Sequence, residues 1–353
     1  MQRLYFVHRF IKAKGIDAFV ITSIKNVRYL AGFTGSSAFA LVTPDRRFVF
    51  TDFRYQEQIS KEVEGWDIVI EKGSRIATIK AFAKKLKIKK IGFEASVSYE
   101  FYKGLADLKF KLLPGTDIVE KARAKKESGE ISKIRAAVER AEKAFLKIKP
   151  YVKTGAKEIE IARRLEEQLK KEGCRSIPFE IIVASGANSA MPHARASQKK
   201  IEKGDFVIID WGGEASGYYS DMTRTLLAAG GSSHEKRKIY SIVDDARKKA
   251  LAVLRAGVGC KAVDAAARVR IKEAGYGDFF GHGTGHGVGL DIHEAPRLSW
   301  TSKDKIAEGA VVTVEPGIYL PGVGGVRIED MALATSNGCE ILTSLNRDLE
   351  VVG

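Results

Sequence analysis

Apolar and polar residues alternate in short blocks along the first third of the chain, and these blocks predict alternating helices and strands. The pattern predicts helices at Leu4–Lys14, Ile76–Leu86 and Glu100–Leu108, and strands at Ala18–Thr22, Ala38–Val42, Arg47–Thr51, Asp67–Glu71, Lys90–Glu94 and Phe110–Leu113. This order of elements is typical of an α/β domain with a mixed sheet. Acids and histidines do not cluster in residues 1–122, so a scaffold or oligomerisation role is expected for this domain.

A charged segment at 122–129 without apolar periodicity marks the expected boundary with a second domain, residues 123–353. Apolar residues then recur at every third or fourth position, which predicts a helix that Pro150 ends. The members of this apolar stripe are Ile131, Ile134, Val138, Ala141, Phe145 and Ile148. A second helix carries Ile161, Leu165 and Leu169, and strand residues begin at Phe179–Val183.

The same order of elements returns after Gly230-Gly231. Helices are expected at Glu235–Arg255 and Lys261–Ala274, and a histidine-rich glycine segment and further strands follow them. Two helices and a strand-rich region therefore occur twice, which indicates an α+β domain built from two similar halves with approximate two-fold symmetry.

Each half contains two acidic residues within a predicted β-hairpin. Asp210 and Asp221 flank a turn placed at Ala215-Ser216, and Glu315 and Glu329 flank a turn placed at Gly322. Symmetric pairing puts the two members of each pair directly opposite each other, with Cβ atoms roughly 4.5–5.5 Å apart. Because like charges at that separation destabilise a hairpin, two such pairs predict a compensating cation.

Four histidines lie in turn-rich segments near these acids, and they are His193, His282, His286 and His293. Carboxylates joined by an imidazole suit Mn²⁺, Co²⁺, Fe²⁺ or Zn²⁺ better than Ca²⁺. Four carboxylates carry more charge than one divalent ion neutralises, so two ions are expected, and paired ions about 3.5–4 Å apart activate water for hydrolysis. The segment His282–Gly287 fits no dinucleotide fingerprint, and His293-Glu294 does not continue into the zinc motif HExxH.

Two further residues share a strand face with the acids, because side chains on one face recur at every second position. Thr223 shares a face with Asp221 and is expected to hydrogen-bond a metal ligand or a bridging oxygen, although an ordinary strand residue is the alternative. Arg327 shares a face with Glu329 and is expected to hold a carboxylate, either of a ligand or of the substrate.

Composition excludes several classes of protein. The net charge of +15 permits nucleic-acid binding, but the lysines are dispersed and no nucleic-acid motif accompanies them, so that partner is not expected. No apolar run reaches about 18 residues, and the N-terminal segment lacks the features of a signal peptide, so neither a membrane span nor export is expected. Three scattered cysteines, Cys174, Cys260 and Cys339, favour a reducing cytoplasm.

Several segments together resemble the pita-bread metallopeptidases, and within them the Xaa-Pro peptidases prolidase and aminopeptidase P. The matching segments are Pro178–Gly186, Pro192-His193-Ala194, Asp210, Ser220–Thr225, Gly281–Glu294, Glu315–Tyr319 and Gly325–Asp330, together with Asn26–Thr34 and Thr51–Tyr55 near the N-terminus. The resemblance implies a creatinase-like domain followed by a pita-bread catalytic domain. It further implies hydrolysis of the Xaa-Pro bond at the N-terminus of dipeptides or short peptides, and a homodimer.

The resemblance also implies a role for each site residue. It makes metal ligands of Asp210, Asp221, His286, Glu315 and Glu329, which would hold two divalent ions, with Mn²⁺ or Co²⁺ expected ahead of Zn²⁺ or Fe²⁺. Asp221 and Glu329 would bridge both ions, and Glu315 would also shuttle the proton. His193 and His293 would contact the scissile group, and His282 would shape the pocket for proline.

Three alternatives remain open at this stage. A methionine-type aminopeptidase shares the ligand set but usually lacks a domain like residues 1–122. A creatinase-like hydrolase has the two-domain build without these ligands, and a non-catalytic module on this fold would be expected to lose some of them. The sequence leaves open whether residues beyond proline are accepted, and therefore whether the activity is that of a dipeptidase or of an aminopeptidase.

Overall fold

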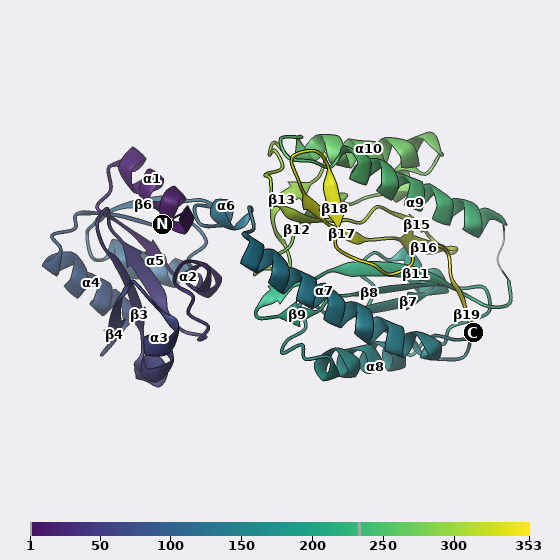
Figure 1. Ribbon diagram of the computed structural model, residues 1–353, viewed down its shortest axis with the longest axis horizontal. Coiled ribbons are helices and arrows are strands. Elements are labelled where there is room, and N and C mark those ends of the chain that lie inside the picture. The colour runs from purple at the N-terminus through teal and green to yellow at the C-terminus, as the bar shows by residue number, and fades with distance from the viewer. Residues whose placement is uncertain (1, 232–233) are drawn as a thin grey trace. The chain divides into compact units, whose positions relative to one another are not determined.

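The computed structural model describes residues 2–231 and 234–353 and divides the chain into two compact units, residues 1–123 and 124–353 (Figure 1). Among the described residues, every helix is too short or too polar to cross a bilayer.

The first unit is a six-stranded mixed sheet flanked by helices, as expected. Its strands are β1 (Ala18–Ile21), β2 (Phe39–Val42), β3 (Arg47–Thr51), β4 (Asp67–Ile70), β5 (Lys90–Glu94) and β6 (Lys111–Gly115). They lie in the sheet in the order β4-β3-β2-β1-β5-β6. Its helices are α1 (Tyr5–Lys14), α2 (Ile24–Ala31), α3 (Gln56–Glu62), α4 (Arg75–Lys85), α5 (Tyr99–Ala106) and α6 (Glu120–Arg123). Phe39 stacks on Phe50 in the core, with ring centroids 4.4 Å apart. The apolar periodicity did not predict the short helices α2 and α3, because each spans only about two turns.

The second unit repeats one arrangement twice. The first half contributes α7 (Ser128–Ile148), α8 (Glu158–Lys171), β7 (Ile182–Ser185), β8 (Phe206–Trp211), β9 (Glu214–Ala215), β10 (Tyr218–Tyr219) and β11 (Met222–Ala228). The second half contributes α9 (His234–Val253), α10 (Cys260–Glu273), β12 (Gly285–Gly287), β13 (Glu294–Leu298), β14 (Val311–Val314), β15 (Gly317–Leu320), β16 (Gly324–Arg327), β17 (Asp330–Ala334) and β18 (Cys339–Ile341), and β19 (Val351–Val352) returns to β11. The two helix pairs lie on opposite sides of the strands, as Figure 1 shows.

The apolar stripe of α7 faces the core as the spacing predicts, and Phe145 stacks on Trp211 of β8 with ring centroids 4.4 Å apart. The strand expected from Phe179 begins only at Ile182. Phe179 and Glu180 instead line a cavity described below.

The expected pairing of Asp210 with Asp221 is wrong. The β8–β11 ladder pairs Asp210 with Thr223. The turn falls at Ser216-Gly217, where both residues have positive φ angles of 50° and 79°. Such angles fit a two-residue hairpin turn that glycine favours. Because the register differs from the expected one by two residues, Asp210 and Asp221 still share a face, as a diagonal pair.

The register of the second hairpin is as predicted. Val314 pairs with Asp330 in one ladder and Gly317 with Arg327 in the next, so Glu315 and Glu329 face each other between the two ladders. Both glutamates lie outside the strands, and their backbone N–H groups donate hydrogen bonds to other segments instead of to each other's strand. The Glu315 N–H donates to the Thr284 carbonyl at 2.8 Å, and the Glu329 N–H donates to the Thr223 carbonyl at 3.1 Å.

Candidate metal centre

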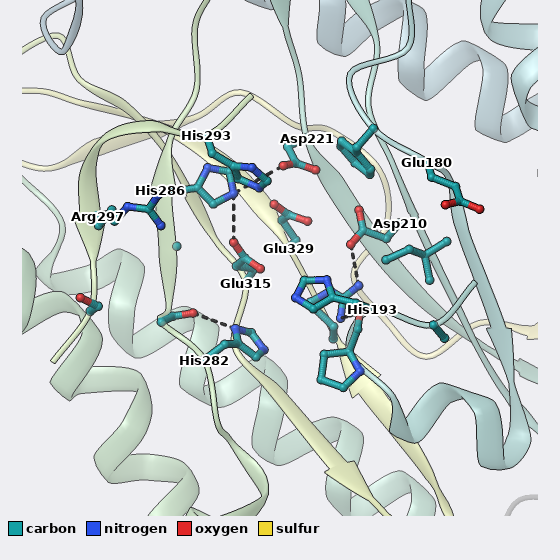
Figure 2. A pocket seen from close by; sticks show the side chains of 18 of the residues that line it. Glu180, His193, Asp210, Asp221, His282, His286, His293, Arg297, Glu315 and Glu329 are labelled. Atoms are coloured by element: carbon teal, nitrogen blue, oxygen red, sulfur yellow. Dashed lines mark hydrogen bonds and ion pairs between the residues drawn. The ribbon is translucent and has the colours of Figure 1, made fainter. Parts of the chain in front are cut away.

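Five acidic and histidine side chains from both halves of the second unit converge at one place (Figure 2). Donor atoms of Asp210, Asp221 and Glu329 lie within 4.8 Å of one another, and so do those of His286, Glu315 and Glu329. Asp210 lies on β8 and Asp221 precedes β11, whereas His286 lies on β12 and the two glutamates flank the β14–β17 ladder. The residues that the sequence singled out as ligands are therefore brought together.

His286 presents one ring nitrogen to the acids. Its Nδ1 lies 3.1 Å from the Gly287 carbonyl, which can only accept, so Nδ1 carries the proton. The unprotonated Nε2 lies 3.5 Å from Asp221 Oδ2 and 3.3 Å from Glu315 Oε1. A backbone carbonyl that fixes the tautomer in this way is typical of metal-binding histidines.

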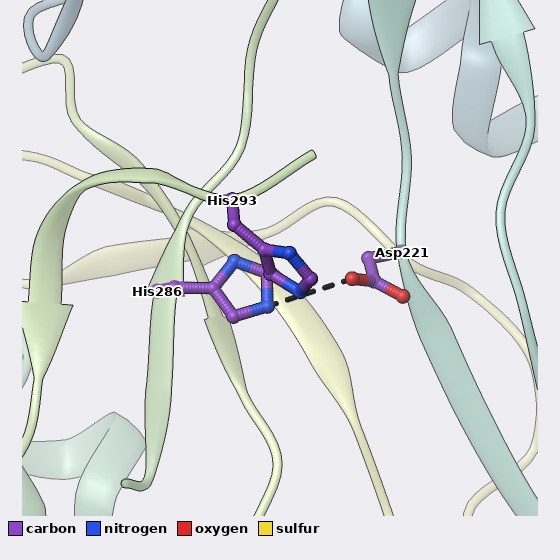
Figure 3. A group of neighbouring side chains, drawn as sticks. All are labelled: Asp221, His286 and His293. Atoms are coloured by element: carbon purple, nitrogen blue, oxygen red, sulfur yellow. Dashed lines mark ion pairs between the residues drawn. The ribbon is translucent and has the colours of Figure 1, made fainter. Parts of the chain in front are cut away.

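His293 lies against this set as well. Its ring meets that of His286 edge to face, with centroids 4.4 Å apart. One of its ring nitrogens lies within 4.8 Å of a carboxylate oxygen of Asp221 and of a ring nitrogen of His286 (Figure 3). Burial and the nearby Arg297 lower the pKa of His293, so its ring is neutral at neutral pH.

Hydrogen bonds from outside the cluster orient its carboxylates. Thr223 Oγ1 donates to Glu329 Oε2 at 2.7 Å and receives a bond from Arg327 Nε at 3.1 Å. Arg327 Nη2 also donates to Asp210 Oδ2 at 2.5 Å. Thr313 Oγ1 donates to Glu315 Oε1 at 3.0 Å. Thr223 thus contacts a candidate ligand, and Arg327 holds the carboxylate of a candidate ligand.

The electrostatics of the cluster call for positive charge. Burial, together with Glu329, Asp210 and Glu315, raises the pKa of Asp221 well above its usual range, and burial with Glu315 and Asp210 does the same for Glu329. Burial raises the pKa of Glu315 to about 7. Burial and the neighbouring His293 lower the pKa of His286 to about 3, which keeps its ring available as a ligand.

Two oxygens of the cluster fit a cation directly. Asp210 Oδ1 and Glu329 Oε1 are buried and accept no hydrogen bond from any residue that the structure describes. Buried carboxylate oxygens without a donor are costly, and a bound cation would satisfy them. The oxygen-rich donor set with one imidazole matches divalent transition metals.

A cavity of about 750 Å³ opens beside the cluster. Besides the five candidate ligands, its lining includes Phe179, Ile182, Pro192, His193, His282, His293, Arg297, Ser299, Thr301 and Arg327. The remaining residues predicted for the site therefore line this cavity, except Thr223, which lies behind Glu329.

His282 belongs to a chain of hydrogen bonds that leads back to Asp210. Its Nδ1 lies 2.8 Å from the Gly283 carbonyl and therefore carries the proton, so Tyr319 Oη donates to Nε2 at 2.9 Å. Tyr319 receives a bond from Arg327 Nη1 at 2.7 Å, which continues the chain to Asp210. Burial and Arg327 lower the pKa of His282 to about 4, so the ring is neutral at neutral pH.

Sequence reasoning missed Tyr319 and Thr313 as members of the site. The strand period that marked Thr223 and Arg327 marks these residues too, because Thr313 precedes Glu315 by two positions and Tyr319 follows it by four. The two-residue strand period was applied to only one strand of each hairpin, so these two residues were not predicted.

The fold and the converging acids define a two-unit metallopeptidase, and comparison with known families agrees. Residues 132–336 match the model of metallopeptidase family M24, and residues 3–125 match the creatinase/prolidase N-terminal domain. The chain therefore belongs to metallopeptidase family M24, a family whose members bind divalent metal ions.

Individual relatives are similar over the full length of the chain. A Xaa-Pro dipeptidase of Pyrococcus horikoshii is 40% identical, over 96% of each chain. A solved Xaa-Pro dipeptidase from Bacillus anthracis is 41% identical with a TM-score of 0.96, and covers 100% of this chain and 99% of its own. A solved X-Pro aminopeptidase from Thermotoga maritima is 40% identical over 98% of each chain, with a TM-score of 0.87.

Proposed function

We propose that this protein is a dinuclear metal-dependent exopeptidase that hydrolyses the Xaa-Pro bond at the N-terminus of dipeptides or short peptides. One observation carries the proposal. Donor atoms of Asp210, Asp221, His286, Glu315 and Glu329 converge beside a cavity, while Asp210 Oδ1 and Glu329 Oε1 are buried without a donor among the described residues. The family match and the Xaa-Pro peptidases among its relatives support the choice of substrate.

Two ions are proposed because the site gathers four carboxylates. Asp221 and Glu329 each belong to two of the close groups of donor atoms and would be shared by both ions. Asp210 would complete the site of one ion, and His286 and Glu315 that of the other. Mn²⁺ or Co²⁺ is the first choice, with Zn²⁺ or Fe²⁺ next, since these ions suit a mixed set of oxygen and imidazole ligands. Bound ions of this kind supply Lewis acidity and lower the pKa of water toward neutrality.

The protein's own groups then divide the remaining work. Glu315, a candidate ligand that also lines the cavity, would take up a proton and deliver it to the leaving imide nitrogen. His193 and His293 line the cavity and would contact the scissile group, where hydrogen-bond donors stabilise the developing oxyanion. His282, which is hydrogen-bonded to Tyr319, would shape the pocket for proline, and Phe179 and Ile182 contribute apolar side chains to the cavity lining.

The decisive experiment is an assay of chelated and reconstituted protein. Metal-free protein is expected to be inactive on a Xaa-Pro dipeptide and to regain activity with Mn²⁺ or Co²⁺. A metal count near two per chain is expected after reconstitution. Absence of metal-dependent release of the N-terminal residue, or full activity in Asp221→Ala or His286→Ala, contradicts the proposal. A metal count near zero favours a non-catalytic module instead.

The substrate panel separates the remaining activities. A Xaa-Pro dipeptide and a Xaa-Pro-Yaa tripeptide compared at equal concentration distinguish a dipeptidase from an aminopeptidase, and relatives of both kinds are known. A Met-Ala peptide tests the methionine-type alternative, which predicts cleavage without proline. We also propose a cytoplasmic homodimer, based on the family resemblance and the three free cysteines, and light scattering on the purified protein measures its oligomeric state.

A further inference from the structure

Each half of the second unit contains a buried acid that belongs to neither the candidate ligands nor the cavity wall. Glu158 is the first residue of α8 and is 0% exposed, and Asp264 lies in the first half of α10 and is 1% exposed. Isolated buried carboxylates are costly, so they occur where hydrogen-bond donors surround them. The donors around both acids come from segments that carry site histidines.

Glu158 ties together the two ends of the segment that carries His193. Its Oε1 receives bonds from Ser185 N at 2.7 Å and Ser185 Oγ at 2.8 Å. Its Oε2 receives bonds from Ser197 N at 3.1 Å and Ser197 Oγ at 2.6 Å, and Asn188 Nδ2 lies 3.1–3.2 Å from both oxygens. Ser185 and Ser197 stand before and after His193, so one carboxylate closes the base of this loop.

Asp264 does the same for the segment that carries His282 and His286. Its Oδ1 receives bonds from Thr284 N at 3.1 Å and Thr284 Oγ1 at 2.9 Å. Asp264 also pairs with Arg268 through two bonds of 2.8 and 2.9 Å. Arg268 in turn donates to the carbonyl of His282 at 2.7 Å. The Thr284 carbonyl receives the Glu315 N–H at 2.8 Å, which extends the connection to a second candidate ligand.

From this geometry we propose that Glu158 and Asp264 are positioning residues with different targets. Glu158 fixes His193, which lines the cavity, and Asp264 fixes the backbone between His282 and His286. In both halves a hydroxyl residue presents its backbone N–H and its side chain to the same carboxylate. The catalytic effect of Glu158 rests on the function proposed above for His193, whereas the effect of Asp264 on metal binding does not depend on the substrate.

The two acids therefore have separate signatures. Glu158→Gln replaces one of the two acceptor oxygens with an NH₂ group, which cannot accept from the donors that face it, so the His193 loop loosens. We expect kcat on a Xaa-Pro dipeptide to fall at least about tenfold while metal affinity stays unchanged, because His193 is not among the proposed ligands. Asp264→Asn is expected to weaken metal affinity by about 10–100-fold, the usual effect of losing a group that orients a metal ligand.

Glu94 offers a matched control in the first unit. It is 4% exposed and accepts bonds from Thr22 N at 2.7 Å, Thr22 Oγ1 at 3.1 Å, Ser23 N at 2.8 Å and Asn26 Nδ2 at 2.6 Å. Glu94→Gln thus breaks a similar buried network that holds no site residue. We expect this variant to keep the metal affinity and kcat of the wild type at temperatures where all variants are folded.

A double-mutant cycle tests whether Glu158 acts through His193. If it does, Glu158→Gln combined with His193→Ala costs no more than His193→Ala alone, whereas independent effects multiply. The proposal for Glu158 is overturned if the two losses multiply in the double mutant. It is also overturned if Glu158→Gln keeps a kcat within twofold of the wild type, or if Glu94→Gln loses as much kcat as Glu158→Gln. An unchanged metal affinity in Asp264→Asn overturns the proposal for Asp264. Ser197→Ala keeps the Ser197 N–H bond to Glu158 and removes only the contacts of the hydroxyl with Glu158, Asn188 and Lys199. It replaces Glu158→Gln if that variant does not fold, and a smaller loss of the same kind is expected.

A measurement without substrate separates this inference from the proposed function. The Arg195 side chain is 84% exposed in the His193 loop and offers a trypsin site. Mass spectrometry of metal-free protein is expected to show faster cleavage after Arg195 in Glu158→Gln than in the wild type or Glu94→Gln. If the wild type has no Xaa-Pro activity, the proposed function fails, and the cleavage rate and metal affinities alone decide the positioning roles. Unchanged cleavage then contradicts the role of Glu158.

Discussion

Two adjacent buried carboxylates, Glu329 and Asp330, have opposite environments. Asp330 is 0% exposed and receives four bonds, from Arg224, Thr343, Arg247 and Arg347, at 2.6–2.9 Å. Burial acts to raise its pKa, but the arginines outweigh burial and hold the pKa below its usual range. Glu329 is 1% exposed, and burial with neighbouring acids raises its pKa well above the usual range.

The contrast separates a structural charge from a charge available to a ligand. Asp330 is neutralised by the protein itself, so it contributes to stability. Among the described residues, the Glu329 carboxylate accepts a hydrogen bond only from Thr223, and its Oε1 has no donor, so it is suited to a cation from outside. Successive residues point to opposite sides of an extended chain, which allows one short segment to serve both purposes.

The largest effect expected from breaking this contrast is on turnover. Glu329→Gln removes a charged candidate ligand and is expected to lower kcat at least about 10³-fold, since metal ions supply several kcal/mol of transition-state stabilisation. Metal analysis after gel filtration is expected to show fewer than two ions per chain. Normal turnover with two retained ions contradicts the assignment of Glu329.

The next largest effect is on stability, and here Asp330 rather than Glu329 is the sensitive residue. Asp330→Asn leaves the buried Arg224 and Arg247 and the partly buried Arg347 without their carboxylate. It is expected to lower the free energy of unfolding by about 3–5 kcal/mol. In metal-free protein Glu329→Gln is not expected to destabilise, because it neutralises a carboxylate whose ionised form is disfavoured. Urea titrations of both metal-free variants measure the difference, and equal losses would remove the distinction between the two residues.

The pH dependence of metal binding sharpens the same distinction. Glu315, with a pKa of about 7, and Asp221 and Glu329, with raised pKa values, hold protons that a metal must displace. Protonated forms dominate below these pKa values, so Mn²⁺ affinity is expected to rise at least about tenfold from pH 6 to pH 8. Calorimetry in buffers of different ionisation enthalpy measures the released protons. An affinity independent of pH contradicts the raised pKa values.

The smallest effect concerns the hydroxyl beside Glu329. Thr223→Val keeps the side-chain shape and removes the 2.7 Å bond to Glu329 Oε2, so metal affinity is expected to fall about tenfold. Thr51→Val is a suitable control, because Thr51 is equally buried on β3 of the first unit and its hydroxyl donates to the Ser37 carbonyl. If both variants bind metal equally well, Thr223 is only a strand residue.

Sequence reasoning predicted which residues converge at the candidate metal centre more accurately than it predicted the hairpin registers that bring them together. The register of the glutamate hairpin followed from the turn at Gly322, which has a φ of 78°. The aspartate hairpin was misplaced because Ser216, a residue that rarely adopts positive φ, occupies half of its turn. Asp210 and Asp221 were still placed on one face because the error was an even number of residues.

The supporting residues were harder to predict for a physical reason. Glu158 and Asp264 lie on helices among many charged residues, and nothing in their spacing distinguishes them from solvated acids. Their partners stand 27 and 20 positions further along the chain and are brought to them only by tertiary packing. Strand period gave Thr223 and Arg327 because those residues neighbour the acids within the same strands.

The backbone hydrogen bonds of Glu315 and Glu329, which lie between the strands of the second hairpin, have a consequence for biogenesis. Glu329 N–H reaches the Thr223 carbonyl, 106 residues earlier, and Glu315 N–H reaches Thr284 in its own half. A nascent chain that has not yet released residue 329 from the ribosome therefore lacks both a candidate metal ligand and this backbone bond between the halves. Loading of the proposed metal site therefore requires translation through residue 329 and folding of the second half of this unit.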